Sequence, residues 1–413
     1  MTADAMPRID GARMLARIDE LARIGAIAGG GCARLALTDE DREGRDLVVA
    51  WMRALGLDVR IDAIGNIFGL TEGWRARRPV LTGSHIDTVR TGGRYDGNYG
   101  VIAGLCVIEA LRAAGTPLAR PLGVAVFTNE EGSRFQPDML GSLVHAGGLD
   151  LAAAHAATDA RGVSVGDELR RIGYLGDEQP GFVTPHAFVE LHIEQGPVLD
   201  SEGLRIGAVA DLQGISWQEI VVVGQSNHAG TTPMRLRRDA GYVAGAATAF
   251  LHDLAGEMGG AQVCTVGRIE LHPNYINVIP ARATFTADLR NTDAERLREA
   301  EARFAAFLDS MATRTGTAIT RRTLARFEPV AFDPRLVAMI EDEAGAMGLR
   351  ALRMTSGAGH DAQMMARICP SAMIFVPSIA GISHNPAERT RDADLVAGAD
   401  LLLRALATLA KEA

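Results

Sequence analysis

Short apolar runs alternate with longer stretches of helical character through the first half of the chain. The apolar runs predict strands at residues 57–62, 64–70, 79–84, 121–128 and 187–193. Between them, residues 100–114 have the composition of a buried helix, and Thr38 followed by three acidic residues predicts the start of another. Strands that alternate with helices in this way are typical of a mostly parallel α/β sheet.

The pattern changes near Asp211. From there the chain predicts six elements in the order β-α-β-β-α-β, at residues 215–223, 236–256, 262–271, 282–290, 293–312 and 317–324. This is the order of the ferredoxin-like fold. Apolar and polar side chains alternate along residues 283–290, as expected for an antiparallel sheet with one exposed face.

The α/β pattern resumes after residue 331, with a helix near 334–347, the apolar strand SAMIFVP and a final helix from about residue 393. We therefore predict an α/β catalytic domain with a mostly parallel sheet, formed by residues 1–212 and 331–413. Residues 213–330 are predicted to be an inserted α+β domain of the ferredoxin-like kind.

Composition argues against several classes of function. The chain has 413 residues, of which 47% are hydrophobic and 23% charged, and a net charge of −9 without a run of lysine or arginine. Nucleic acid and anionic membranes are therefore not expected partners. The apolar runs are about half the roughly 20 residues that cross a bilayer, and the acidic start does not resemble a signal peptide. We expect a cytoplasmic protein whose four separated cysteines are reduced.

Two turn-rich segments, each after an apolar run, concentrate imidazole and carboxylate groups. GSHIDTVRTGGRYDGNYG spans residues 83–100, and FTNEEGSRF spans residues 127–135. Two later histidines, His192 and His384, have similar surroundings. Nitrogen and oxygen donors of these kinds bind divalent metal ions, so the sequence predicts a metal site at the carboxyl ends of the strands, where open α/β sheets bind ligands.

The spacing within these segments indicates separate roles. His85 and Asp87 lie two residues apart, so on extended backbone their side chains point the same way, and we expect the Asp87 carboxylate to hold the imidazole. Asp96 lies in a glycine-rich turn, and its two oxygens can bridge two metals. Glu130 and Glu131 are adjacent and cannot share a direction. One is expected to bind metal and the other to take a proton from water.

Eight motifs carry a resemblance to a known family, in the order GSHIDTV, YDGNYGV, TNEEGSRF, HIEQGPVL, NHAGTTPM, NVIP, SGAGHDA and GISHNP. With these motifs nearly the whole chain resembles the M20 metallopeptidase and amidohydrolase superfamily. Within it the chain is similar to the hydantoinase/carbamoylase group, which includes N-carbamoyl-L-amino acid hydrolases, bacterial β-ureidopropionases and allantoate amidohydrolases. HIEQGPVL and SGAGHDA favour this group over the peptidases.

The resemblance implies two divalent ions in each subunit. The first would be bound by His85, Asp96 and His192, and the second by Asp96, Glu131 and His384. It also implies that Glu130 is the general base and that Asp87 supports His85. Zn²⁺ suits these ligands, and Mn²⁺, Co²⁺ or Ni²⁺ suit the same nitrogen and oxygen set.

The resemblance further implies a homodimer with shared active sites, in which the inserted domain serves as dimerisation or lid domain. His228, Asn277 and Arg290 all lie in the inserted domain, and the resemblance favours their reaching the partner's site, where His228 would polarise the scissile carbonyl. Gln195 would bind the ureido group, while Asn277 and Arg290 would hold the substrate carboxylate. Gly359 and His360 would line the pocket, and His360 has the alternative of capping the helix that follows it.

We therefore expect a metal-dependent amidohydrolase that cleaves a ureido C–N bond in a small carboxylate-bearing substrate. An N-carbamoyl-L-amino acid or N-carbamoyl-β-alanine is the first candidate. Allantoate is the closest alternative, because an allantoate amidohydrolase would share every catalytic position. An M20 aminopeptidase or dipeptidase is a further alternative, which HIEQGPVL opposes. A non-catalytic metal-binding scaffold is another, and the presence of Glu130 counts against it.

Overall fold

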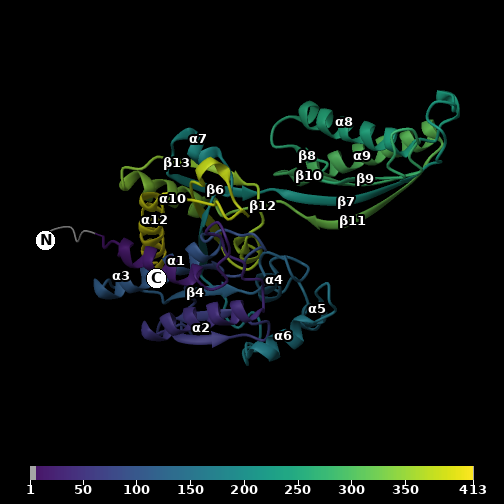
Figure 1. The fold of residues 1–413 in the computed structure, drawn as a ribbon. Helices are drawn as coiled ribbons and strands as arrows, with labels where there is room; N and C mark the ends of the chain where they lie inside the picture. Colours follow the sequence, from purple (N-terminus) through teal and green to yellow (C-terminus); the bar gives the residue numbers. More distant parts are fainter. Residues whose placement is uncertain (1–5, 413) are drawn as a thin grey trace. The chain divides into compact units, whose positions relative to one another are not determined.

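A computed structural model describes residues 6–412 of the chain. The chain divides into two compact units, one formed by residues 1–210 and 332–413 and the other by residues 211–331 (Figure 1). None of the described helices is both long enough and apolar enough to span a bilayer.

A nine-stranded mixed sheet forms the base of the first unit, although its strand β12 and the last two residues of β6 lie within residues 211–331. Its order is β1-β2-β4-β3-β5-β14-β6-β12, with β13 paired to β6. The central strands β4, β3, β5 and β14 are parallel, and the outer pairs β1–β2, β2–β4, β14–β6 and β6–β12 are antiparallel. The strands are β1 (Asp58–Ile61), β2 (Ile67–Leu70), β3 (Val80–His85), β4 (Leu122–Phe127), β5 (Ala187–Ile193), β6 (Ile206–Leu212), β12 (Val330–Ala331), β13 (Ala351–Ser356) and β14 (Ser371–Val376).

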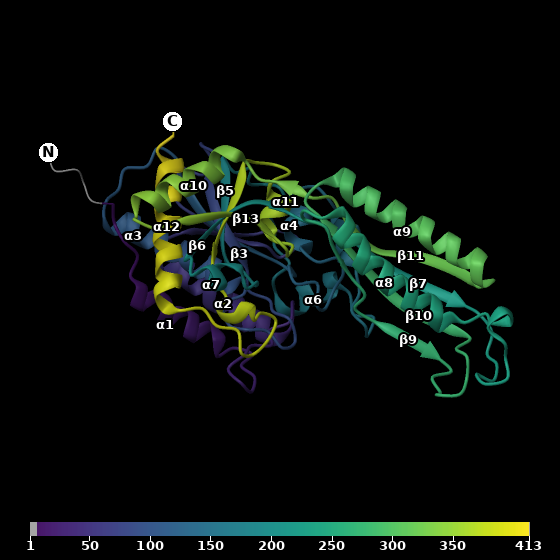
Figure 2. The same ribbon diagram turned by 90° about the horizontal axis from the view of Figure 1, so that it is seen from above.

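Helices cover this sheet, and α12 packs on α3, β5 and β14 (Figure 2). The predicted start of α2 is confirmed, because the Thr38 side chain accepts a hydrogen bond from the Asp41 amide. The helices are α1 (Gly11–Ala22), α2 (Asp39–Ala54), α3 (Asn98–Ala113), α4 (Leu140–His145), α5 (Leu151–Ala156), α6 (Val165–Ile172), α7 (Val198–Glu202), α10 (Pro334–Ala346), α11 (Asp361–Met365), α12 (Asp392–Ala410) and the 3₁₀ turn η2 (Ile379–Gly381).

The four parallel strands place their carboxyl ends along one edge. The strands themselves are buried throughout, so their apolar side chains fill the core between the helical layers. Loops leaving that edge therefore converge, as is usual for ligand sites in α/β folds.

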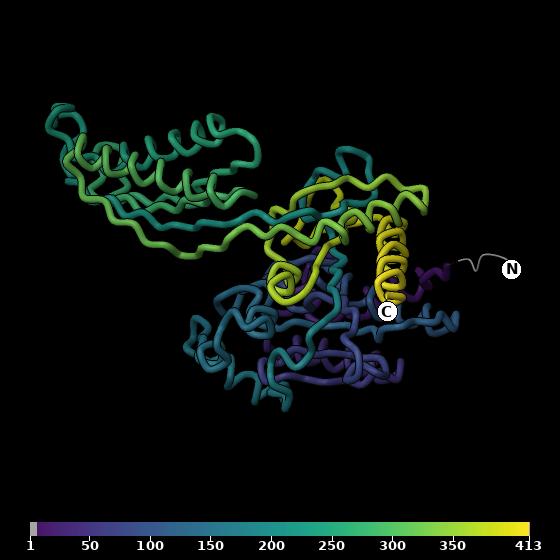
Figure 3. Tube along the Cα trace, turned by 180° about the vertical axis from the view of Figure 1, so that it is seen from behind, coloured from purple at the N-terminus to yellow at the C-terminus, as the bar shows by residue number. Residues whose placement is uncertain are grey.

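The second unit contains a five-stranded antiparallel sheet of order β11-β7-β10-β8, with β9 also paired to β10. The long strands β7 and β11 run side by side (Figure 3). This order confirms the predicted ferredoxin-like connection. The elements are β7 (Gly214–Val223), η1 (Met234–Leu236), α8 (Ala240–Met258), β8 (Val263–Thr265), β9 (Ile269–His272), β10 (Arg282–Asn291), α9 (Ala294–Thr315) and β11 (Ala318–Phe327).

The alternation along β10 is confirmed. Ala283, Phe285, Ala287 and Leu289 are buried in a core with residues of α8 and α9, and the residues between them are partly exposed. One detail differs from the prediction, because residues 262–271 form two short strands instead of one. Gly267 lies between them, and glycine weakens a strand interior.

Candidate metal centre

Five predicted ligands converge at the carboxyl edge of the parallel strands. His85 is the last residue of β3, His192 lies on β5, and Glu131 follows β4. Asp96 lies between β3 and α3, and His384 lies in the loop between β14 and α12. The structure thus brings together residues that are as many as 299 positions apart in the chain (85 to 384).

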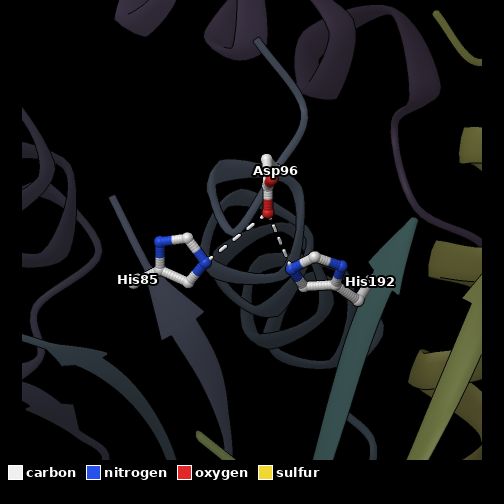
Figure 4. Close-up of side chains that lie close together, drawn as sticks. All are labelled: His85, Asp96 and His192. Carbon is white, nitrogen blue, oxygen red and sulfur yellow. Dashed lines mark ion pairs between the residues drawn. The ribbon is translucent and has the colours of Figure 1, made fainter. Parts of the chain in front are cut away.

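The first group is formed by His85, Asp96 and His192 (Figure 4). Oδ1 of Asp96 lies 3.2 Å from Nε2 of His192 and 3.7 Å from Nε2 of His85. Nδ1 of His85 faces the carbonyl oxygen of Asp87 at 2.9 Å, and Nδ1 of His192 faces that of Ile193 at 2.9 Å. Each imidazole can donate from Nδ1, so a neutral ring has its lone pair on Nε2, and in His192 this atom also accepts a hydrogen bond from the Gly97 amide at 3.1 Å.

The second group uses the other oxygen of Asp96. Oδ2 of Asp96 lies 3.3 Å from Nε2 of His384, which is 3.4 Å from Oε2 of Glu131. Asp96 thus faces one histidine pair with Oδ1 and the second group with Oδ2. His384 has a side chain that is 50% exposed, whereas the other four are at most 5% exposed.

The two groups fit divalent metal ions. Tetrahedral coordination at bond lengths near 2.0–2.1 Å separates ligand atoms by about 3.3 Å, and the ligand spacings of 3.2–3.7 Å match this value. Oε1 of Glu131 is buried without a hydrogen-bond partner, as expected for an oxygen suited to a cation. The combination of imidazole and carboxylate is a borderline donor set, which suits zinc and its neighbours.

The electrostatics of the centre also favour a cation. Burial, followed by the charges of Asp361 and Glu131, raises the pKa of Glu130 well above its usual range. Burial and the charge of Asp96 do the same for Glu131. Burial opposes ionisation of Asp96, yet hydrogen bonds from His192 and His384 hold its pKa well below the usual range. A bound dication would stabilise these crowded carboxylates in their ionised form.

The structure corrects the expected role of Asp87. Its backbone carbonyl holds His85, while its carboxylate accepts hydrogen bonds from the backbone amides of Glu130 at 3.2 Å and Glu131 at 3.3 Å. The side chain of Asp87 thus faces the two residues that lie beyond the end of β4. The predicted contact between the carboxylate and the imidazole was therefore wrong.

Glu130 lies beside the first group. Its Oε2 is 3.4 Å from Nε2 of His85, and the residue is 7% exposed. Glu131 turns instead to His384. The two adjacent glutamates therefore point to different groups, as the sequence predicted for neighbouring residues that leave a strand.

Gln195 also lies at the centre. Its Nε2 donates to Oδ2 of Asp96 at 2.9 Å and lies 3.4 Å from Nε2 of His384. Oε1 of Gln195 is buried without a partner. The side-chain oxygen of Gln195 is thus a buried, unpaired acceptor beside the candidate metal ligands.

His360 and Gly359 lie at the end of β13. The His360 ring is buried 4.6 Å from the His192 ring, and its Nε2 is 3.0 Å from the Ser356 hydroxyl. The side chain does not cap α11, so the capping alternative is wrong. A Cβ at Gly359 would lie 3.0 Å from Cε of Met139, so this position has little free space.

The remaining predicted site residues belong to the second unit, where they lie at two different ends of the sheet. The amide of Ala229 donates to the carbonyl of Asn277, which places the exposed His228 and Asn277 side by side. Arg290 lies near the other end of β10, where it is paired with Ile215 of β7. Its guanidinium forms a bidentate pair with Asp288 at 2.9–3.1 Å.

Three buried carboxylates behind the centre were not predicted. Glu190 accepts hydrogen bonds from Ser84 and Ala362, Asp361 accepts one from Ser142, and Glu388 faces the Asp96 loop. Glu190 had a detectable signal, because an acid inside the apolar strand AFVELHI requires a buried partner. Nothing in their local sequence distinguishes Asp361 and Glu388 from surface acids.

Known proteins match this chain over nearly its full length. The profile of peptidase family M20/M25/M40 matches residues 81–408. An N-carbamoyl-L-amino-acid amidohydrolase of Rhizobium meliloti is 39% identical over 400 residues, covering 97% of this chain and 96% of that protein. An allantoate amidohydrolase of Escherichia coli K12 is 39% identical over 396 residues, covering 94% of this chain and 96% of that protein. A crystal structure of a hydantoinase/carbamoylase family amidase from Burkholderia multivorans is 42% identical with a TM-score of 0.94, covering 98% of this chain and 99% of that one.

Proposed function

Since the chain belongs to peptidase family M20/M25/M40, and within it to the hydantoinase/carbamoylase amidases, we propose that it hydrolyses the ureido C–N bond of an N-carbamoyl-L-amino acid. It is a metal-binding amidohydrolase that acts on carbon–nitrogen bonds other than peptide bonds. N-carbamoyl-β-alanine belongs to the same substrate class.

One observation carries the proposal. Two ligand groups share Asp96, and a further carboxylate, that of Glu130, lies 3.4 Å from His85 without belonging to either group. Such an arrangement supports hydrolysis, which needs a polarising centre and a separate base.

We assign the first ion to His85, Asp96 and His192, and the second to Asp96, Glu131 and His384, with Zn²⁺ as the preferred ion. Bound divalent ions supply Lewis-acid polarisation of the carbonyl and lower the pKa of water. Glu130 is placed to accept the proton of the attacking water and to return it to the leaving nitrogen. Asp87 acts by holding the backbone of Glu130 and Glu131. For an N-carbamoyl amino acid the products are the amino acid, carbon dioxide and ammonia.

Gln195 is assigned to the ureido group, and His360 and Gly359 to the pocket wall. His228 is assigned to the developing oxyanion. Nδ1 of His228 accepts hydrogen bonds from the amides of Gly230 at 3.0 Å and Thr231 at 3.2 Å. In the neutral ring this leaves the proton on Nε2, so the histidine offers an outward donor.

We further propose a homodimer with shared active sites. β10 spans about 27 Å from Arg282 to Arg290 at about 3.4 Å per residue, and the pairing that joins Asn277 to Ala229 lies beyond Arg282. A small ureido acid is far shorter than this, so Arg290 and Asn277 of one chain cannot hold the same molecule.

The two ends of β10 therefore suit two different sites. Arg290 lies at the opposite end of β10 from His228 and Asn277, so if those two residues serve the partner's site, we assign Arg290 to the site of its own chain. His228 and Asn277 are assigned to the site of the partner. Their neighbours Tyr275 and Ile276 are 71% and 104% exposed, and such apolar side chains suit a surface that becomes covered.

The function is tested by incubating metal-loaded enzyme with N-carbamoyl-L-amino acids, N-carbamoyl-β-alanine, allantoate and a dipeptide panel, and by detecting free amine and ammonia. Turnover of N-carbamoyl-L-amino acids is expected to exceed that of the other substrates. Allantoate is the second candidate, because relatives of both activities are 39% identical to this chain. Preferential peptide cleavage would overturn the proposal.

A further inference from the structure

Glu388 is a buried carboxylate, 5% exposed and located between β14 and α12, and it forms no salt bridge with any of the described residues. Its Oε1 accepts hydrogen bonds from the backbone amides of Tyr95 at 3.1 Å and Asp96 at 3.4 Å. Its Oε2 accepts a hydrogen bond from the Ser383 hydroxyl at 2.8 Å. Burying a carboxylate is costly, so these three contacts account for its presence in the interior.

These contacts join two loops that each carry a metal ligand. Asp96 is the aspartate shared by the two ligand groups, and Ser383 directly precedes His384. Glu388 therefore connects the backbone of Asp96 to Ser383, the residue next to His384. The fit is close, because a Cβ at Gly93 would lie 2.0 Å from Oε1 of Glu388.

His384 needs such support more than the other imidazoles do. His85 and His192 lie on strands of the central sheet, which fix their backbones. His384 lies on a loop, has a 50% exposed side chain and adopts a φ of 53°. A non-glycine residue in that region is held there by its surroundings.

We propose that Glu388 is a positioning residue that fixes His384 relative to Asp96 and thereby sets the affinity of the second metal ion. The inference rests on the proposed two-metal function. Partners that orient metal ligands typically contribute about 10- to 100-fold to metal affinity. Both ions would use Asp96, but the first would otherwise be bound by His85 and His192, which strands hold, whereas the second depends on the loop residue His384. Removal of Glu388 is therefore expected to weaken the second ion more than the first.

The test compares Glu388→Ala and Glu388→Gln by titrating chelator-treated protein with Zn²⁺ against a chromophoric chelator. Glu388→Ala is expected to weaken the second binding step by at least about 10-fold and to leave the first within about 3-fold. Glutamine keeps both hydrogen-bond functions, since its oxygen accepts from the two amides and its NH₂ donates to the Ser383 hydroxyl. Glu388→Gln is therefore expected to stay near the wild-type affinity.

Two further variants separate positioning from general loss of structure. Ser383→Ala removes one of the three contacts and should weaken the second step by less than Glu388→Ala, and the double variant should resemble Glu388→Ala alone. Glu343→Ala is the matched control, because Glu343 also joins two segments, α10 and α12, through hydrogen bonds from Arg404 and Thr408, and neither helix carries a candidate ligand. It should leave both binding steps unchanged.

The outcomes are distinct. Two wild-type binding steps that both persist in Glu388→Ala, or both weaken equally, would overturn the positioning role. A wild-type protein that binds fewer than two ions would instead overturn the two-metal function on which the role rests. Selective loss of the second binding step in Glu388→Ala, with near wild-type affinity in Glu388→Gln, would support the positioning role.

Discussion

The carboxylate of Asp87 accepts a hydrogen bond from the backbone amide of Glu130 at 3.2 Å. Its other oxygen accepts one from Glu131 at 3.3 Å. A single side chain thus fixes the backbone of two adjacent glutamates, one of which faces His85 and the other His384. The different directions of these two glutamates depend on the two hydrogen bonds to Asp87.

Glu130→Gln is expected to retain the fold and the metal content but to lower kcat by at least about 100-fold, because glutamine cannot accept the proton of the attacking water. Steady-state kinetics on metal-loaded enzyme, with metal analysis of the same sample, checks this. Glu131→Gln serves as the comparison, since it should lose metal as well as activity. A Glu130→Gln enzyme with near wild-type kcat would show that another group is the base.

Purified protein prepared without chelators is expected to contain two divalent ions per chain. The reason is that Asp96 presents Oδ1 to one group and Oδ2 to the other. Metal analysis should give about one equivalent for His384→Ala, because that residue belongs only to the second group. A wild-type content that saturates at one, and is unchanged in His384→Ala, would contradict the bridged pair.

The structure brings the candidate ligands together because several of them end or follow strands. His85, Glu130 and Glu131 come directly after short apolar runs, and parallel strands bring such positions to one edge whatever lies between them. The helix start at Thr38 and the alternation along β10 could be predicted because both depend only on residues that are neighbours in the sequence.

Contacts set by tertiary packing could not be predicted. The backbone direction after β3 decides that Asp87 faces Glu130 and not His85. Motif order likewise gave no means of placing Arg290 and Asn277 at opposite ends of one sheet, because strand register fixes that distance. Glu388 resembles a surface acid in sequence, and only the fold brings it beneath Asp96.

The chelator-treated protein is expected to lose stability as pH rises from about 4 to 7. Burial, then the charge of Asp41, raises the pKa of Asp87 to about 7, whereas an unfolded aspartate titrates near 3.9. Between these values the folded chain holds a proton that the unfolded chain has released. The free energy of unfolding therefore falls by up to about 1.4 kcal/mol per pH unit for such a group.

Glu130 and Glu131 act in the same direction, because their pKa values are also raised, chiefly by burial. His85 opposes them, because burial lowers its pKa to about 4 and so favours the folded state as pH rises to about 6.5. Urea unfolding at pH 5, 6 and 7 measures the combined effect of these groups on the free energy of unfolding. Asp87→Asn should reduce the slope of that free energy against pH. Stability that rises with pH over this range would contradict the assignment of these groups.

Neutral His228 is expected to be protonated at Nε2. The amides of Gly230 and Thr231 both point at Nδ1, so that nitrogen must accept. Nitrogen-15 NMR of labelled histidine distinguishes the two ring nitrogens, with His228→Gln used to identify the signal. The exposed His252 offers a control without these two donors. A predominant Nδ1–H form would remove the basis for an Nε2–H donor to the oxyanion.

Mixing inactive variants is expected to reveal which chain supplies each residue of a site. Glu130→Gln and His228→Ala homodimers should each be nearly inactive. If His228 serves the partner's site, a mixed dimer carries both lesions in one site and leaves the other intact. Activity should then recover towards about half per mixed dimer, provided that the sites act independently.

Arg290 is expected to behave differently, because it lies at the opposite end of β10 from His228 and Asn277 and cannot serve the same site as they do. In a dimer of Glu130→Gln with Arg290→Ala, one site lacks the base and the other lacks its own arginine, so no recovery is expected. Subunit exchange is confirmed by mass in both mixtures. Recovery with Arg290→Ala would assign the arginine to the partner's site, and failure with His228→Ala would mean that each chain completes its own.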